Sequence, residues 1–86
     1  MSIKNIKKEF PIFDNKVHNN DLVYLDSANS SQKPQSVIDR VNDFYGKEFS
    51  NVGRSVHYLA VAATNLYETT RSSVQKYINA KDKHEI

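Results

Sequence analysis

Residues 23–34, VYLDSANSSQKP, decide how the chain is organised. The apolar run at 22–25 predicts a short β-strand, because β-branched and aromatic side chains suit a pleated, half-buried surface. Asp26 and the small polar residues after it favour a turn over 27–34. Pro34 suits the start of a helix, because its φ is preset and it has no amide hydrogen to leave unpaired. The polar turn is either plain structure or the wall of a site.

Helices are predicted on both sides of this stretch. Residues 2–10 carry apolar side chains at helical spacing, with Ser2 as an N-cap and Pro11 as the stop. Residues 35–46 have apolar positions that recur on one helical face, and Gly46 ends or loosens that helix. The apolar positions of this second helix are Val37, Ile38, Val41, Phe44 and Tyr45.

The second half of the chain predicts one long helix. Residues 57–79 combine an amphipathic pattern with alanines that favour helix formation. Residues 11–26 hold a loop and the short strand, and residues 47–56 form a connecting loop. The chain is therefore predicted to be mostly α with one short strand, and residues 1–86 to form a single partial unit.

The composition predicts a thin core. The 86 residues include 38% hydrophobic side chains, and the mean hydropathy is −0.66. Cysteine is missing from the sequence, so neither a disulfide nor a thiolate metal site adds stability. We expect the chain to need a partner or to belong to something larger, and Ile86 resembles the first residue of a further strand.

The charge pattern excludes some function classes. The net charge is only +2 and the lysines alternate with acidic residues, which favours solvated helix faces over a nucleic-acid patch. No segment of the sequence approaches the ~20 apolar residues of a transmembrane helix, and the first ten residues lack the apolar run of a signal peptide. We expect a cytoplasmic chain with no nucleic-acid or membrane partner.

Taken singly, the candidate catalytic residues are weak. His18, His57 and His84 lack the spacing of a metal site, so no metal is expected. With Gly46 and Gly53 as the only glycines, a glycine-rich phosphate cradle is nearly excluded. The sequence also holds no nucleophile elbow. The residues themselves therefore predict no catalytic group.

Two smaller features stay open between structure and function. Asp26 can bond to turn amides, as in an Asx-turn, or face a site. Arg54 and His57 lie three residues apart at the entry to the long helix. They can meet an anion together or form ordinary surface contacts.

The order of the motifs along the chain is a more specific indication of family than any single motif. EFPIF, then LVYLDSANSSQKPQSVIDRVNDFY, then SNVGRSVHYLAVAATNLYETTRSSVQKYINAKDKHEI resembles the N-terminal portion of group II (SufS-type) cysteine desulfurases, members of the class V aminotransferase family. The Phe-Pro motif, the LDSA…QKP block, the NV-R--H segment and the closing INA turn occur in the family's order and spacing. The resemblance covers essentially all of the chain.

This resemblance implies an enzyme of pyridoxal-phosphate fold type I, in which the chain is an N-terminal small-domain segment of an α/β fold. Such enzymes form homodimers, take sulfur from L-cysteine as a persulfide on their own cysteine, and release alanine. They pass the sulfur to an acceptor protein for iron–sulfur cluster assembly. The implied partners of this chain are the remainder of the enzyme or a homodimer mate.

The resemblance also implies roles for five residues. Ser27, Ala28 and Asn29 would line the substrate pocket, and Arg54 and His57 would lie at the active-site mouth or the dimer interface. The chain departs from the family's common NVHRGVH by Gly53 in place of the first His and by Ser55 in place of the Gly.

The family's Schiff-base lysine and persulfide cysteine fall after the matched segment. The large cofactor domain is therefore expected to be absent, and with it any catalytic residue, so the chain alone is predicted to be inactive and not to hold the cofactor. Two other interpretations stay open. One is a stand-alone helical interaction module, and the other is a fragment of a selenocysteine lyase or another class V lyase.

Overall fold

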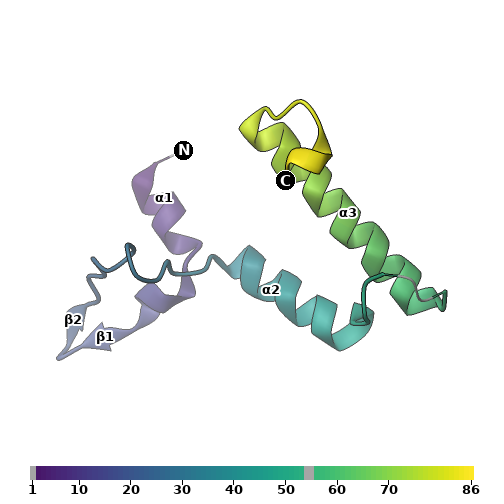
Figure 1. Cartoon of the computed structure of the whole chain (residues 1–86). Coiled ribbons are helices and arrows are strands. Elements are labelled where there is room, and N and C mark those ends of the chain that lie inside the picture. Colours follow the sequence, from purple (N-terminus) through teal and green to yellow (C-terminus); the bar gives the residue numbers. More distant parts are fainter. Residues whose placement is uncertain (1, 54–55) are drawn as a thin grey trace. The chain divides into compact units, whose positions relative to one another are not determined.

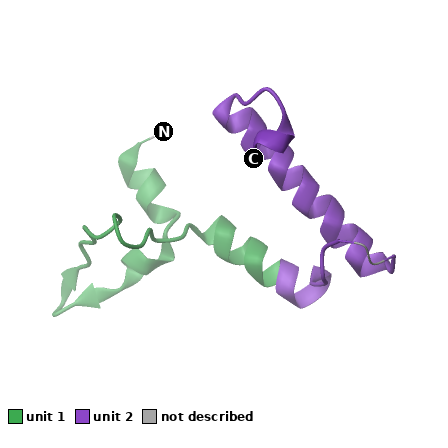
Figure 2. Cartoon of the chain, in the orientation of Figure 1, with its two compact units in different colours: residues 1–43 green, residues 44–86 purple. Residues whose placement is uncertain are grey.

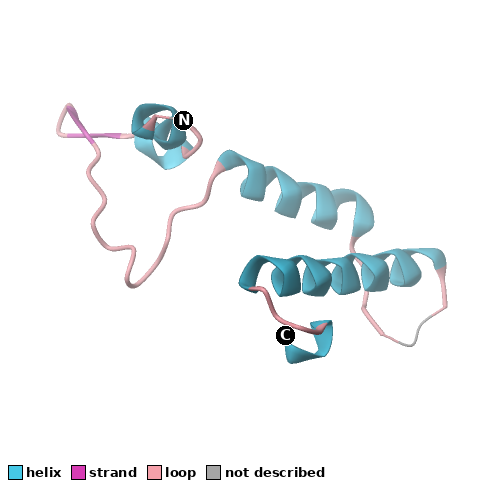
Figure 3. Cartoon of the chain, turned by 90° about the horizontal axis from the view of Figure 1, so that it is seen from above, coloured by secondary structure: helices cyan, strands magenta, loops and turns pink. Residues whose placement is uncertain are grey.

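The computed structural model describes residues 2–53 and 56–86, and helices dominate them (Figures 1 and 3). The chain divides into two compact units, Met1–Asp43 and Phe44–Ile86 (Figure 2). The first unit holds α1 (Ile3–Lys8), the 3-10 helix η1 (Pro11–Asp14), β1 (Lys16–Val17), β2 (Asn20–Asp21) and α2 (Gln35–Asp43). The second holds the π-helical turn η2 (Phe44–Glu48), α3 (Tyr58–Ile78) and the 3-10 helix η3 (Lys83–Glu85).

Local signals set the ends of α1. The Ser2 hydroxyl oxygen accepts a hydrogen bond from the Asn5 N–H at 3.2 Å, so Ser2 is the N-cap. The helix ends at Lys8, and Pro11 then begins η1, where its fixed φ suits a first position. The helix is therefore shorter than the 2–10 span that the sequence predicts.

The prediction of a strand at 22–25 is wrong. The sheet of the described residues is a hairpin in the predicted loop, with Lys16 opposite Asp21 and Val17 opposite Asn20. His18 and Asn19 have φ of 51° and 66°, the left-handed values that a two-residue hairpin turn of type I′ requires. A ladder needs a partner strand, and residues 22–25 pair with none of the described residues.

Residues 22–25 nevertheless show the alternation of an extended segment. Leu22 and Tyr24 are half-buried, whereas Val23 and Leu25 are 73% and 92% exposed. Such a period of two is the geometry in which neighbouring side chains point to opposite faces. The segment is therefore shaped like a strand without being paired.

The predicted helix at 35–46 is shorter and changes its winding. The Pro34 carbonyl accepts hydrogen bonds from the N–H groups of Val37 and Ile38, which starts α2 one residue after the proline. The Gln35 N–H also donates to the Glu9 carbonyl at 2.7 Å, joining the start of α2 to the end of α1. After Asp43 the chain continues as the π-helical turn that contains Gly46. A residue without a side chain tolerates such loosening because it has no Cβ to constrain φ.

Capping at both ends defines α3. His57 is its N-cap, and Asn79 closes it in the left-handed conformation, with φ 60° and ψ 36°. The Ala80 N–H donates to the Gln75 carbonyl and the Asn79 N–H to the Lys76 carbonyl, which is a Schellman motif. Among the described residues, the buried hydrophobic side chains are Ala60 and Ala63, so the core is small and lies on the first turns of this helix.

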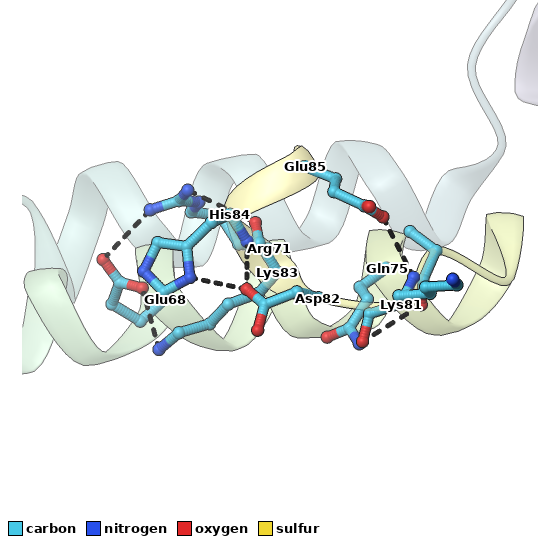
Figure 4. A network of polar contacts seen from close by, with 9 residues as sticks. Glu68, Arg71, Gln75, Lys81, Asp82, Lys83, His84 and Glu85 are labelled. Carbon is cyan, nitrogen blue, oxygen red and sulfur yellow. Dashed lines mark hydrogen bonds and ion pairs between the residues drawn. The ribbon is translucent and has the colours of Figure 1, made fainter.

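The residues after α3 fold back onto it through polar contacts (Figure 4). Gln75 Nε2 donates to the carbonyls of Ala80 and Lys81 at 3.3 and 3.2 Å. Glu68 pairs with Arg71 at 3.7 Å and with Lys83 at 3.6 Å. Nothing among the described helices is long and apolar enough to cross a membrane.

Candidate functional site

The turn predicted after the apolar run begins at Asp26. The Asp26 carbonyl accepts hydrogen bonds from the N–H groups of Asn29 and Ser30, at 3.0 and 3.1 Å. Its carboxylate accepts a further bond from the Asn29 side-chain amide at 2.9 Å. The Asp26 carbonyl therefore accepts the turn amides that the sequence suggested for its carboxylate. The carboxylate binds the Asn29 side chain instead.

This turn presents the three predicted pocket residues together. Ser27, Ala28 and Asn29 are consecutive and exposed at the tip of the turn. They offer a hydroxyl, a methyl and an amide, and none of these groups is charged or strongly nucleophilic. The turn can therefore contact a ligand by hydrogen bonds, but its side chains supply no acid, base or nucleophile for chemistry.

A tyrosine that the sequence reasoning did not single out closes the turn. The Tyr24 hydroxyl lies against the Ser30 carbonyl and is 3.3 Å from the Asp26 carbonyl. These two carbonyls stand at the two ends of the turn. The signal in the sequence is a tyrosine inside an otherwise aliphatic run, two residues before the aspartate, because a half-buried tyrosine usually gives its hydroxyl a partner.

The turn borders an apolar hollow of about 440 Å³ in the first unit. Of the three predicted pocket residues, Ser27 lines this hollow. Its other lining residues come from α1, η1 and the chain around the turn: Ile3, Ile6, Lys7, Phe10, Phe13, Tyr24, Ser31 and Gln32. The hollow therefore offers mainly apolar contact, with a few hydroxyl and amide groups and one ammonium group at its edge.

Of the other two predicted site residues, Arg54 and His57, the structure describes His57. Arg54 lies outside the described residues, as does Ser55. His57 is described, and its Nδ1 atom accepts a hydrogen bond from the Ala60 N–H at 3.3 Å. His57 is thus the N-cap of α3.

The shifted pKa values lie away from the turn. The backbone N–H of His84, and then its ring, hold the pKa of Asp82 below its usual value. A hydrogen bond from Lys16 lowers the pKa of Asp21 in the hairpin. Both aspartates are exposed side chains of local turns, so neither shift indicates an acid or base poised for catalysis.

The described residues offer neither a metal-binding cluster nor a lysine suited to an imine. In residues 2–53 and 56–86, no three His, Cys, Asp or Glu side chains gather as a metal site would require. Every lysine is exposed except Lys83, which is half-buried and paired with Glu68. A lysine that forms an imine needs a pKa lowered by burial or by a neighbouring cation, so these lysines do not fit that role.

Known proteins resemble this chain along its whole length. The family model described as "Aminotransferase class-V" matches residues 23–86. A "Probable cysteine desulfurase" of Streptomyces coelicolor is 48% identical over 82 residues, which cover 94% of this chain and 20% of that protein. A "Probable cysteine desulfurase" of Halalkalibacterium halodurans is 45% identical over 100% of this chain and 21% of its own length.

A "Cysteine desulfurase" of Wigglesworthia glossinidia brevipalpis is 46% identical over 98% of this chain and 20% of its own length. The chain therefore spans about a fifth of the length of these curated relatives. The family model covers well over half of the chain, including the turn and the whole of α2 and α3. The chain belongs to the aminotransferase class-V family.

Proposed function

We propose that this chain is the N-terminal segment of a pyridoxal-phosphate-dependent cysteine desulfurase of the SufS type. The whole enzyme would convert L-cysteine to L-alanine and leave the sulfur as a persulfide on the enzyme. An acceptor protein would then take the sulfur for iron–sulfur cluster assembly. The proposal is supported by the three relatives named above, which carry the desulfurase name and match 94–100% of the chain.

Within that enzyme the segment would supply one wall of the substrate pocket. The observation that carries this role is the turn at Asp26, which holds Ser27, Ala28 and Asn29 exposed at its tip while its ends are tied by hydrogen bonds. A fixed tip with small polar side chains suits contact with a small amino acid. We keep Arg54 and His57 as candidates for the active-site mouth or the dimer interface.

The cofactor would be held elsewhere in the enzyme. Pyridoxal phosphate supplies an electron sink when it is bound. The lysines of this chain do not fit the bond to it, and the sequence has no cysteine to carry a persulfide. We therefore place the Schiff-base lysine and the persulfide cysteine in the part of the relatives that this chain does not span, within a fold-type I enzyme located in the cytoplasm.

An interaction module is the second candidate, because the chain exposes large apolar side chains. Leu25, Val56, Tyr58 and Tyr77 are each more than 80% exposed. Such surfaces suit a partner of matching shape. The partner in the proposed enzyme is its remaining four fifths or a homodimer mate, whereas a module would bind an unrelated protein.

The test joins the chain to the part of a relative that it does not span. The chain is joined to the part of the Streptomyces coelicolor relative that follows the matched segment, and alanine release from L-cysteine is measured with pyridoxal phosphate present. We expect activity from the joined protein and none from either part alone. A joined protein that binds the cofactor but leaves cysteine intact would contradict the proposal. Faster turnover of selenocysteine than of cysteine would favour a selenocysteine lyase.

A further inference from the structure

Tyr24 borders both the apolar hollow beside α1 and the exposed turn. The ring of Tyr24 lines the apolar hollow together with Ile6 and Phe10, while its hydroxyl reaches the carbonyls of Asp26 and Ser30. Its neighbours in sequence, Val23 and Leu25, are 73% and 92% exposed, so Tyr24 is the inward-facing residue at this point of the chain.

The hydroxyl contact fixes the turn from its two ends. The backbone bonds from the N–H groups of Asn29 and Ser30 both converge on the Asp26 carbonyl. These two bonds leave the direction of the Ser30 carbonyl unset, and the Tyr24 hydroxyl meets that carbonyl. A phenol has one O–H to donate, so the proton is shared with, or alternates between, the two carbonyls. Either way the hydroxyl restrains the opening of the turn.

We propose that Tyr24 is a positioning residue for the substrate-facing turn, an inference that rests on the proposed function. Tyr24 does not itself touch the substrate. Its ring borders the hollow that α1 also lines, and its hydroxyl holds the turn that carries Ser27, Ala28 and Asn29. The placement of these three side chains therefore depends on the phenolic oxygen as well as on the bonds to Asp26.

The first test is amide hydrogen exchange in the full 86-residue chain. Tyr24→Phe removes the hydroxyl and keeps the ring, so the packing in the hollow stays. We expect the exchange rates of the Asn29 and Ser30 amides to rise about threefold to tenfold, the range expected when one hydrogen bond is lost. Tyr77→Phe is the matched control, because it removes the same atom from a side chain that is 92% exposed on α3. Unchanged exchange at Asn29 and Ser30 would overturn the proposal.

The second test uses the joined enzyme described above. We expect Tyr24→Phe to raise the KM for L-cysteine at least threefold while kcat, cofactor content and far-UV circular dichroism stay unchanged, because the pocket wall is loosened and the chemistry is not. Equal KM values for Tyr24→Phe and the parent would overturn the positioning role even if the turn exchanges faster. Failure of the proposed function looks different, since the parent joined enzyme would then itself leave cysteine unconverted.

Discussion

The Nδ1 atom of His57 accepts a hydrogen bond from the backbone N–H of Ala60, with 3.3 Å between the two nitrogens. Ala60 is fully buried, so this bond satisfies an N–H at the start of α3 that water does not reach. His57, for which the resemblance implies a place at the active-site mouth or the dimer interface, is thus the cap of α3. The capping bond alone gives the His57 side chain a part in the stability of α3.

Replacing His57 separates the two roles. We expect His57→Ala to destabilise α3 by about 0.5–2 kcal/mol, whereas His57→Asp keeps an acceptor at the cap and retains the helix. Circular dichroism of the whole chain during thermal unfolding measures the difference. Equal helicity of both variants and the parent would mean that the cap contributes nothing. In the joined enzyme, loss of activity in His57→Asp with its helix intact would identify a role beyond capping.

The two glycines should respond to alanine in opposite directions. Gly53 has φ of 129°, a conformation that side chains disfavour, and its N–H donates to Thr64 Oγ1 at 3.2 Å. A Cβ meets no atom within 4 Å at either glycine, so backbone conformation alone decides the outcome. We expect Gly53→Ala to cost about 1–3 kcal/mol. Gly46 lies in η2 without a positive φ, so Gly46→Ala should stabilise by about 0.5–1 kcal/mol.

The same backbone conformation should disfavour the histidine that the resemblance gives as common at position 53. We expect Gly53→His, which restores that histidine, to destabilise the isolated chain as much as Gly53→Ala does. Urea unfolding followed by circular dichroism compares the three variants with the parent. A Gly53→His chain as stable as the parent would show that this loop adapts its backbone to the side chain.

The turn at Asp82 should respond to acid. Asp82 caps η3 by accepting from the His84 N–H at 2.8 Å, and this bond is the main reason that its pKa is lowered. Because the folded pKa is below the unfolded one, the carboxylate stabilises the turn above the ordinary aspartate pKa, and this stabilisation is lost as the pH falls through the folded pKa.

A carbon-detected NMR titration of the Asp82 carboxyl measures this pKa. In His84→Ala the ring contact is lost but the backbone N–H remains, so we expect the pKa of Asp82 to rise while staying below its ordinary value. A pKa of Asp82 that returns fully to the ordinary value in this variant would show that the His84 ring, and not the His84 backbone N–H, lowers it.

The exposed aromatic corner of the second unit should promote self-association. Phe44, Tyr45 and Phe49 contact one another with ring centroids 5.5–5.9 Å apart, yet Tyr45 and Phe49 are 66% and 59% exposed. Apolar surface left open to water favours association. We expect sedimentation velocity to show oligomers that grow with concentration, and a Tyr45→Ser/Phe49→Ser double variant to shift the chain towards monomer.

Lys47→Ser is the matched control, because it changes the same turn without removing apolar surface. It should leave the association unchanged. The thermal transition of the parent should be broad and of low midpoint, since the buried hydrophobic side chains of the described residues are two alanines. A sharp transition above ~65 °C that does not depend on concentration would contradict this expectation.

The helices show how far the sequence alone reaches. The long helix was predicted at 57–79 and lies at Tyr58–Ile78, because apolar periodicity, alanine content and capping residues act within a few turns of the chain. Ser2 as the N-cap and Pro34 before the second helix follow from the same local rules. The order of the motifs also predicted the family, and the family-model match over residues 23–86 confirms that prediction.

The strand shows where local rules stop. Residues 22–25 have strand-like composition and alternate in exposure, but a strand exists only where another segment supplies ladder hydrogen bonds. The hairpin formed instead at β1 and β2, where two residues with positive φ turn the chain back on itself. Composition favoured a strand at 22–25. The backbone geometry of the tight turn at His18 and Asn19 instead placed the paired strands at β1 and β2.

The sequence by itself determined the α-helical segments α1, α2 and α3, the polar turn after Asp26 and the family to which the chain belongs. The tertiary structure alone decided that the Tyr24 hydroxyl closes the turn and that Glu68 joins Lys83 across the turn after α3. The physical reason is the separation along the sequence of the groups that interact. Helix periodicity and capping are set by neighbours in sequence, whereas a side chain finds its partner only after the backbone has brought the two groups within hydrogen-bond distance.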